Sequence, residues 1–125
     1  MVEGIFREGA LRVSLVIFAA NEQQHTLECL IDTGFAGQLK LSPYWVGILQ
    51  LPKFGEERFR MADGRWGVHE IYRAQILWGE VEQEIEVVQM VGEPLVGIEL
   101  LQNHHLDARL VEGGTICLAL LDDIL

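Results

Sequence analysis

The chain is short of positive charge, cysteine, proline and long hydrophobic runs. Nine lysines and arginines stand against 19 aspartates and glutamates, which leaves a net charge of -10. This balance argues against nucleic-acid binding and against contact with an anionic membrane surface, since both need clustered basic side chains. The apolar run at residues 13–20 follows Glu3 and Glu8 and is too short to span a membrane, so it predicts a strand.

The two cysteines, Cys29 and Cys117, lie in apolar runs. We interpret them as small buried hydrophobic residues in a reducing cytosol, and we expect a cytoplasmic protein. The length of 125 residues suits one domain, residues 1–125, with a core of its own. Half of the residues are hydrophobic and 22% are charged, which is ordinary for a globular domain.

Thirteen glycines at short intervals separate runs rich in Val, Ile and Leu, a pattern that predicts short strands and tight turns. Asp63-Gly64 and Gly79-Glu80 are hairpin turn signals. Ser42 and Pro43 predict the start of a short helix that runs to residue 49. Together, these strand, turn and helix signals predict a mostly β fold, a small closed barrel with one or two short helices. The expected strands are residues 11–20, 23–31, 38–41, 56–62, 67–78, 81–91, 106–111 and 115–121; a second short helix is expected at residues 98–103 and a solvated tail at Asp122-Asp123.

One carboxylate stands at the end of a predicted buried strand. Residues 30–34 read Leu-Ile-Asp-Thr-Gly, so Asp32 passes from an apolar run directly into a tight turn. A charge in this position is unfavourable unless it has partners or a function. Two such carboxylates facing each other would share one proton. The ionised one could then take a proton from water, while the neutral one donates a hydrogen bond to a substrate carbonyl.

A second Asp-Thr-Gly triplet is missing from the chain. The similar triplet Ala62-Asp63-Gly64 lies in a predicted hairpin turn and lacks the preceding apolar run. A facing carboxylate must therefore come from another copy of the chain, and a two-fold homodimer supplies it because the axis passes between identical loops. Thr33 could hydrogen-bond across that axis, and Gly34 lets two backbones approach closely.

From about residue 11 to residue 121 the chain resembles the retropepsin-like aspartic proteases, in particular their bacterial branch. The resemblance rests on the Asp-Thr-Gly triplet, the stretch 35–41 that follows it, the hairpin at residues 62–64, and Leu95-Val96-Gly97 before a short helix. It implies a homodimeric aspartic endopeptidase that acts on peptides or proteins with no cofactor and no metal. The residues it implies are Asp32 as the catalytic group, Thr33, Gly34, Leu95, Val96 and Gly97 as support for the catalytic loop, and Ala62, Asp63, Gly64, Arg65 and Trp66 as a substrate-covering flap.

Two positions depart from the retroviral pattern. Phe35, Ala36 and Gly37 stand where retroviral members have a small residue and then acidic residues that contact the substrate backbone. Ile98 and Glu99 follow Gly97 where retroviral members carry an arginine. An ion pair of the retroviral type at the dimer edge therefore cannot form here in the same way.

Several alternative readings are weighed. The fold could serve as a dimeric peptide-binding or scaffold module without hydrolysis. The chain could be a monomer in which Asp32 has no partner, or Asp32 could be an ordinary turn residue. Arg65 and Trp66 could form a surface cation–aromatic pair instead of covering a substrate. His104-His105 could suggest a metal site, but adjacent histidines point apart on a strand, so we read them as a solvated turn.

Overall fold

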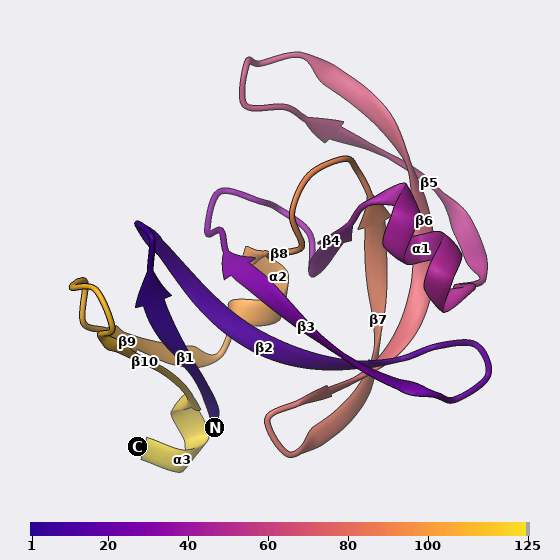
Figure 1. Cartoon of the computed structure of the whole chain (residues 1–125). Coiled ribbons are helices and arrows are strands. Elements are labelled where there is room, and N and C mark those ends of the chain that lie inside the picture. Colours follow the sequence, from indigo (N-terminus) through magenta and orange to yellow (C-terminus); the bar gives the residue numbers. More distant parts are fainter. Residues whose placement is uncertain (125) are drawn as a thin grey trace.

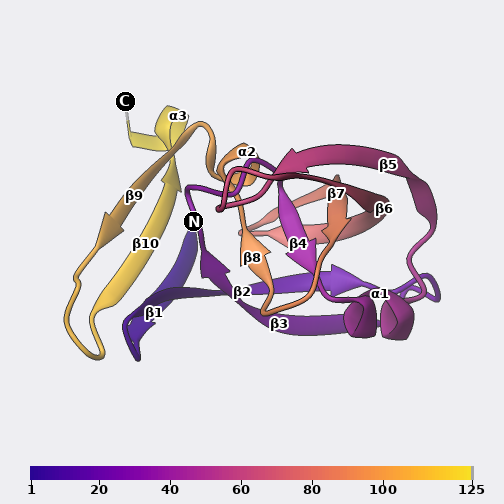
Figure 2. The same cartoon turned by 90° about the horizontal axis from the view of Figure 1, so that it is seen from above.

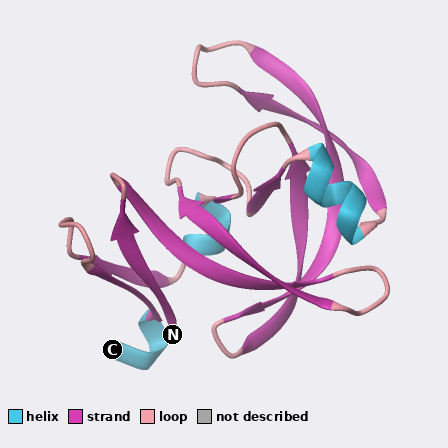
Figure 3. Cartoon of the chain, in the orientation of Figure 1, coloured by secondary structure: helices cyan, strands magenta, loops and turns pink. Residues whose placement is uncertain are grey.

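The computed structural model describes the backbone of residues 1–124 and the side chains of residues 1–122. The fold is mostly β, which confirms the predicted class: strands dominate the chain, and the helices are short (Figure 3). The strands are β1 (Val2–Arg7), β2 (Ala10–Phe18), β3 (Gln24–Ile31), β4 (Leu39–Leu41), β5 (Lys53–Arg60), β6 (Trp66–Trp78), β7 (Val81–Gln89), β8 (Leu95–Val96), β9 (His104–Ala108) and β10 (Thr115–Leu120); the helices are α1 (Pro43–Leu49), α2 (Ile98–Leu101) and α3 (Leu121–Ile124).

Six strands pair in a circuit around the core. β6 pairs with β7, β7 with β4, β4 with β8, β8 with β3, β3 with β2, and β2 returns to β6. Two of these pairings, β3 with β8 and β4 with β7, are parallel. The remaining pairings are antiparallel: β2 with β3 and β6 with β7 are hairpins of consecutive strands, whereas β4 with β8 and β2 with β6 join distant segments (Figure 1). The circuit encloses buried side chains such as Leu15, Ile17, Leu39, Ile76 and Val87.

Beside this circuit, β1, β10 and β9 continue the sheet, and β10 pairs with both of its neighbours (Figure 2). The sequence analysis did not predict β1. Glu8 and Gly9 form the turn between β1 and β2, with φ of 51° and 76°. Positive φ at both positions is the geometry of a two-residue hairpin turn whose twist matches that of the strands. The tail expected at Asp122-Asp123 is instead part of α3, and Asp122 is exposed.

The predicted start of α1 is confirmed. The side-chain oxygen of Ser42 accepts a hydrogen bond from the backbone N–H of Trp45 at 3.5 Å, and Pro43 occupies the first turn. Gln50 ends the helix in the left-handed conformation with φ of 51°. Val46 and Leu49 bury one face of α1 in the core, which ties the helix to the barrel. No helix among the described residues is long and apolar enough to cross a membrane.

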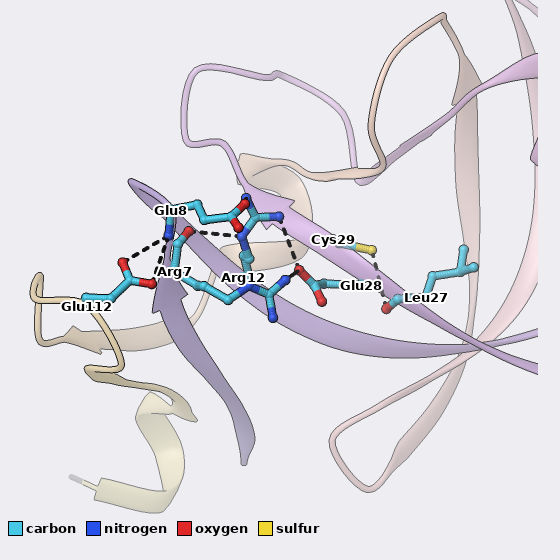
Figure 4. Close-up of polar contacts among 7 residues, drawn as sticks. All are labelled: Arg7, Glu8, Arg12, Leu27, Glu28, Cys29 and Glu112. Atoms are coloured by element: carbon cyan, nitrogen blue, oxygen red, sulfur yellow. Dashed lines mark hydrogen bonds and ion pairs between the residues drawn. The ribbon is translucent and has the colours of Figure 1, made fainter.

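A small ionic cluster joins the first hairpin to β3. The carboxylate of Glu28 accepts hydrogen bonds from the guanidinium groups of Arg7 and Arg12 (Figure 4). The hydrogen bond and charge of Arg7 hold the pKa of Glu28 below its ordinary value. The side chains of Arg7 and Glu28 are roughly two-fifths exposed, so water screens this ion pair.

Cys29, the next residue along β3, is fully buried, as predicted, and burial raises the pKa of its thiol to about 12. Cys117 is half-buried, and both cysteines are free thiols.

Candidate active site

Asp32 stands where two parallel strands end side by side. Ile31 on β3 pairs with Val96 on β8, so Asp32 and Gly97 leave the sheet at the same edge. The N–H of Asp32 donates to the carbonyl of Val96 at 2.9 Å, which extends the pairing by one residue. Parallel strands bring their carboxyl ends together, so this placement follows from the topology. The site is therefore built at the end of paired strands rather than on a free loop.

The turn at Asp32 is held by its own side chain and backbone. The carboxylate oxygen Oδ1 accepts a hydrogen bond from the N–H of Gly34 at 2.9 Å, and the backbone carbonyl accepts one from Phe35 at 3.2 Å. Asp32 itself is half-buried, whereas Thr33 and Gly34 are exposed. The carboxylate is thus oriented locally, while the next two residues face outward.

Gly97 lies directly behind this turn. A Cβ atom added at Gly97 would lie 2.1 Å from the carbonyl oxygen of Gly37 and 2.8 Å from that of Phe35. Such distances are far inside van der Waals contact, so no side chain fits without displacing backbone. Close by, the N–H of Gly97 donates to Gln38 and that of Ile98 donates to Phe35, both at 2.9 Å. We call residues 32–38 together with residues 95–98 the floor of the site.

The hairpin of β5 and β6 arches over the floor in both views (Figures 1 and 2). Its tip is the predicted Asp63-Gly64 turn: Gly64 has φ of 87°, and the Asp63 carboxylate accepts a hydrogen bond from the N–H of Arg65. Phe59 reaches down to the floor, where its ring centre lies 6.1 Å from that of Phe35. Residues 58–66 of this hairpin form the roof of the site.

A cavity of about 750 Å³ separates floor and roof. Its apolar lining includes Phe35, Phe59, Met61, Met90 and Leu95. The volume suits a short stretch of peptide, because pockets of several hundred Å³ enclose drug-sized ligands. We call this cavity the cleft. The charged residues that border it are Asp32, Lys40, Arg58 and Arg60.

The structure brings most of the predicted site residues to the cleft. Asp32, Gly34, Leu95, Ala62 and Trp66 line it, whereas Val96 and Gly97 are buried beneath it. Leu95 is half-buried rather than in the core, because it faces the cleft. Four further predicted residues do not line the cleft: Thr33, which is exposed beside Asp32, and Asp63, Gly64 and Arg65 at the exposed hairpin tip.

Lys40 is a site residue that the sequence analysis missed. It lies between Leu39 and Leu41 on β4, and its side chain is buried, with 8% exposure for the residue. Its ammonium group donates a hydrogen bond to the carbonyl of Val91 at 3.1 Å. Burial lowers the pKa of Lys40 below its ordinary value, although the charges of Asp32 and Glu93 oppose this shift. A lysine inside a short apolar strand was the signal that could have identified it.

Asp32 is the only acidic side chain among the described residues that line the cleft. One chain therefore holds one carboxylate and one buried ammonium group at this site, and no pair of carboxylates. The His104-His105 pair lies elsewhere, at the start of β9, where His104 accepts a hydrogen bond from the indole N–H of Trp78 at 3.3 Å. Among the described residues, no group of three or more His, Cys, Asp or Glu side chains is placed to hold a metal ion.

Comparison with known proteins identifies the fold. No protein-family model matches the sequence, and no curated protein matches it. Among solved structures, the EIAV protease complexed with the inhibitor HBY-793 superimposes with a TM-score of 0.61 at 16% identity, over 76% of this chain and 88% of that one. A retropepsin-like aspartic protease from Rickettsia conorii gives a TM-score of 0.57 at 15% identity, over 94% of this chain and 87% of that one. The chain thus has the fold of the retropepsin-like aspartic proteases, as the sequence predicted.

Proposed function

We propose that the chain is an aspartic endopeptidase that works as a two-fold homodimer. Asp32 of each subunit would supply one carboxylate, and the pair would activate a water molecule to hydrolyse a peptide bond. The proposal also places the enzyme in the cytoplasm, in keeping with its two free cysteines. Metal and cofactor have no part in this chemistry.

The observation that carries the proposal is the position of Asp32. It lies at the end of β3 on the floor of a cavity of about 750 Å³, under a hairpin that can cover an extended peptide. The Asp32-Thr33-Gly34 triplet of this chain lies on the fold that this chain has in common with the EIAV and Rickettsia proteases. An extended peptide could pair with backbone there as an added strand, with its side chains directed alternately to floor and roof.

The chemistry needs two carboxylates that share one proton. Two like charges in contact disfavour double ionisation, so the pair would share one proton. The ionised Asp32 takes a proton from the water as that water attacks the carbonyl carbon. The protonated Asp32 donates a hydrogen bond to the carbonyl oxygen, where negative charge develops. Thr33, exposed beside Asp32, would reach the partner loop, and Gly34 would leave room for that approach.

One observation favours the second candidate, a dimeric peptide-binding module without hydrolysis. Lys40 and Asp32 line the same cavity, so an ammonium group shares the site with the carboxylate. A nearby ammonium group stabilises the ionised carboxylate, and this opposes the shared proton that the dyad requires. A site of this kind could still bind an extended peptide while it cleaves slowly or not at all.

The decisive experiment compares the wild type with Asp32→Asn. Sedimentation at micromolar concentration should show a dimer for both. Wild type should cleave members of a diverse peptide library, and a transition-state-analogue inhibitor of aspartic peptidases should stop it. Asp32→Asn should abolish cleavage, and the dimer should be as stable as wild type or more stable near neutral pH, because the variant removes the repulsion between the two carboxylates.

Each outcome of this experiment points to one reading. A strictly monomeric protein at high concentration rules out the dyad. Cleavage that survives in Asp32→Asn removes Asp32 from the catalytic role. A dimer that binds peptides but cuts none supports the binding module instead. A large loss of stability at neutral pH in Asp32→Asn marks Asp32 as a structural turn residue.

A further inference from the structure

The side chains of β5 near its tip point alternately toward the floor and away from it. Phe59 points to the floor, because its ring centre lies 6.1 Å from that of Phe35. The pairing of β5 with β6 is regular on both sides of Phe59, and successive side chains of a strand leave opposite faces. Arg58 and Arg60 therefore point outward, although both residues border the cleft.

Two exposed apolar side chains share this outward face. Arg58 pairs with Val68 and Arg60 pairs with Trp66 across the hairpin, and directly paired residues of a sheet point to the same side. The guanidinium group of Arg58 lies 5.2 Å from the centre of the Trp66 ring, as expected for residues on one face. Trp66 is 58% exposed and Val68 is 63% exposed. We call Arg58, Arg60, Trp66 and Val68 the outer patch.

The two arginines of the outer patch have no carboxylate within 4 Å among the described residues. Acidic groups are not scarce on the same hairpin, but they pair elsewhere. The carboxylates of Glu56 and Glu70 lie 3.5 Å and 3.3 Å from the ammonium group of Lys53. The outer patch is therefore a local positive charge in a chain of net charge -10.

We propose that the outer patch is a docking surface for an acidic segment of another protein, one that carries a bulky apolar side chain among its carboxylates. Its carboxylates would bind Arg58 and Arg60 through charge-assisted hydrogen bonds, and its apolar side chain would pack on Trp66 and Val68. Arginine and tryptophan are enriched among the residues that dominate binding at protein interfaces. The inference goes beyond the proposed function and does not depend on it.

Charge complementarity determines the kind of partner. An acidic segment is attracted by the outer patch and repelled by the rest of a chain with a net charge of -10, so it is directed to this one face. Nucleic acids and anionic membrane surfaces fit the patch less well. Both are bound by clusters of many basic side chains, whereas the outer patch offers two arginines.

Fluorescence anisotropy with labelled peptides tests the inference. The probe peptide carries glutamates around one phenylalanine. One control peptide has glutamine in place of each glutamate, and another has alanine in place of the phenylalanine. At low salt the probe should bind wild type about tenfold more tightly than the glutamine peptide and severalfold more tightly than the alanine peptide, and added salt should remove the first difference. Asp32→Asn changes only the cleft, so it should leave probe binding unchanged.

The double variant Arg58→Gln with Arg60→Gln should weaken probe binding by about tenfold and abolish its salt dependence. Both side chains are exposed, so thermal unfolding should stay close to that of wild type. Trp66→Ala should weaken probe binding severalfold at every salt concentration. Arg109→Gln is the matched control, because Arg109 is exposed, donates to Thr115 and lies outside the roof. This control should bind the probe as wild type does.

Several results would overturn the inference. No binding of the probe, or equal binding of the probe and the glutamine peptide, removes the charge preference. Unchanged binding in the double variant, or a loss of binding in Arg109→Gln, shows that the outer patch does not carry it. Tighter binding to Asp32→Asn than to wild type places the acidic probe in the cleft instead. None of these results bears on cleavage by Asp32, which the peptide-library assay decides separately.

Two further measurements separate the other possible occupants. A double variant that sediments as a smaller assembly than wild type assigns the outer patch to a second copy of this chain. Single-stranded DNA or vesicles of anionic lipid that bind more tightly than the probe assign it to another class of partner. Either result overturns the inference; sedimentation equal to that of wild type and weaker binding of DNA and vesicles support it.

Discussion

The floor and the roof of the cleft are held in different ways. The floor is joined by backbone hydrogen bonds between residues 32–38 and 95–98, with no room for a side chain at Gly97. The roof has its own hairpin pairing and meets the floor at the ring contact of Phe59 with Phe35. The comparison indicates that backbone packing fixes the position of Asp32, whereas the roof depends mainly on the pairing within its own hairpin.

The largest effect should follow from crowding the floor. Gly97→Ala places a methyl group against the carbonyl oxygens of Gly37 and Phe35, so the backbone must shift. We expect the free energy of unfolding to fall by about 3 kcal/mol, because the contact involves backbone rather than flexible side chains. Denaturant unfolding of the variant and of wild type measures this difference in the free energy of unfolding.

Gly47→Ala is the matched control for this change. A Cβ atom at Gly47 meets nothing within 4 Å, and the residue lies inside α1. Alanine should raise the free energy of unfolding by roughly 0.5–1 kcal/mol, since glycine is a poor helix former. If Gly97→Ala and Gly47→Ala behaved alike, the floor would not depend on close backbone approach.

A change in the roof should separate function from stability. Phe59→Ala removes the ring that meets Phe35, and we expect peptide cleavage or binding to weaken by about tenfold because the cleft loses its cover. The free energy of unfolding should fall by about 1 kcal/mol or less, since Phe59 is only half-buried. Phe54→Ala, on the same strand but away from the cleft, should leave cleavage or binding unchanged. A loss of stability as large as that of Gly97→Ala would show that the roof is as rigidly built as the floor.

A smaller effect, with a defined pH dependence, should come from Lys40. Burial lowers its pKa in the folded state, so near neutral pH the folded protein holds an unfavourable buried charge. Lys40→Met should therefore raise the free energy of unfolding at neutral pH by about 1 kcal/mol. Between the lowered pKa and the ordinary value near 10.5, the unfolded chain binds more protons than the folded one, so wild type should regain stability relative to the variant as pH rises.

Lys53 provides the opposite case for the same measurement. A hydrogen bond from Lys53 to Glu70 raises the pKa of Lys53, so its contribution is present below the ordinary value and is lost as pH rises through the raised one. Wild type should therefore lose stability relative to Lys53→Met at high pH. Equal slopes for the two variants in thermal unfolding across neutral to alkaline pH would contradict the burial of the Lys40 charge.

The smallest effect should come from a surface ion pair outside both regions. Glu28→Gln removes the charge that Arg7 and Arg12 share on the first hairpin (Figure 4). The pKa of Glu28 is lowered, so its stabilising contribution is present at neutral pH and lost on acidification, but the exposed site is screened by water. Thermal unfolding of wild type and Glu28→Gln should differ only slightly, and added salt should reduce that difference.

The sequence predicted the local features of the fold well. Alternating and apolar runs marked most strands, and the Ser42 cap and the Asp63-Gly64 turn were read correctly because each depends on neighbouring residues. β1 was missed because its short run contains Gly4 and alternates with charged residues, which leaves a weak apolar pattern. The motif at residues 95–97 was placed by resemblance, and the structure puts it beneath the Asp32 turn.

The basic residues that border the cleft could not be predicted in the same way. Lys40 and Arg60 are separated by a helix and a strand in the sequence, and they border one cavity only because β5 folds back over the floor. No local pattern encodes that convergence. An isolated lysine in an apolar strand indicates a buried charge, but the sequence alone does not show which groups lie near that charge.

The parallel pairing of β3 with β8 has a consequence for how the protein folds. Leu30 must find Leu95 across about half of the chain, whereas the hairpin of β5 and β6 joins neighbouring segments. Contacts between distant segments require a large loss of chain entropy, so they form slowly and late. The turn around Asp32 is completed only when these distant segments meet, because the N–H of Asp32 pairs with the carbonyl of Val96. Whatever depends on the position of Asp32 therefore depends on long-range assembly of the chain and not on a local turn.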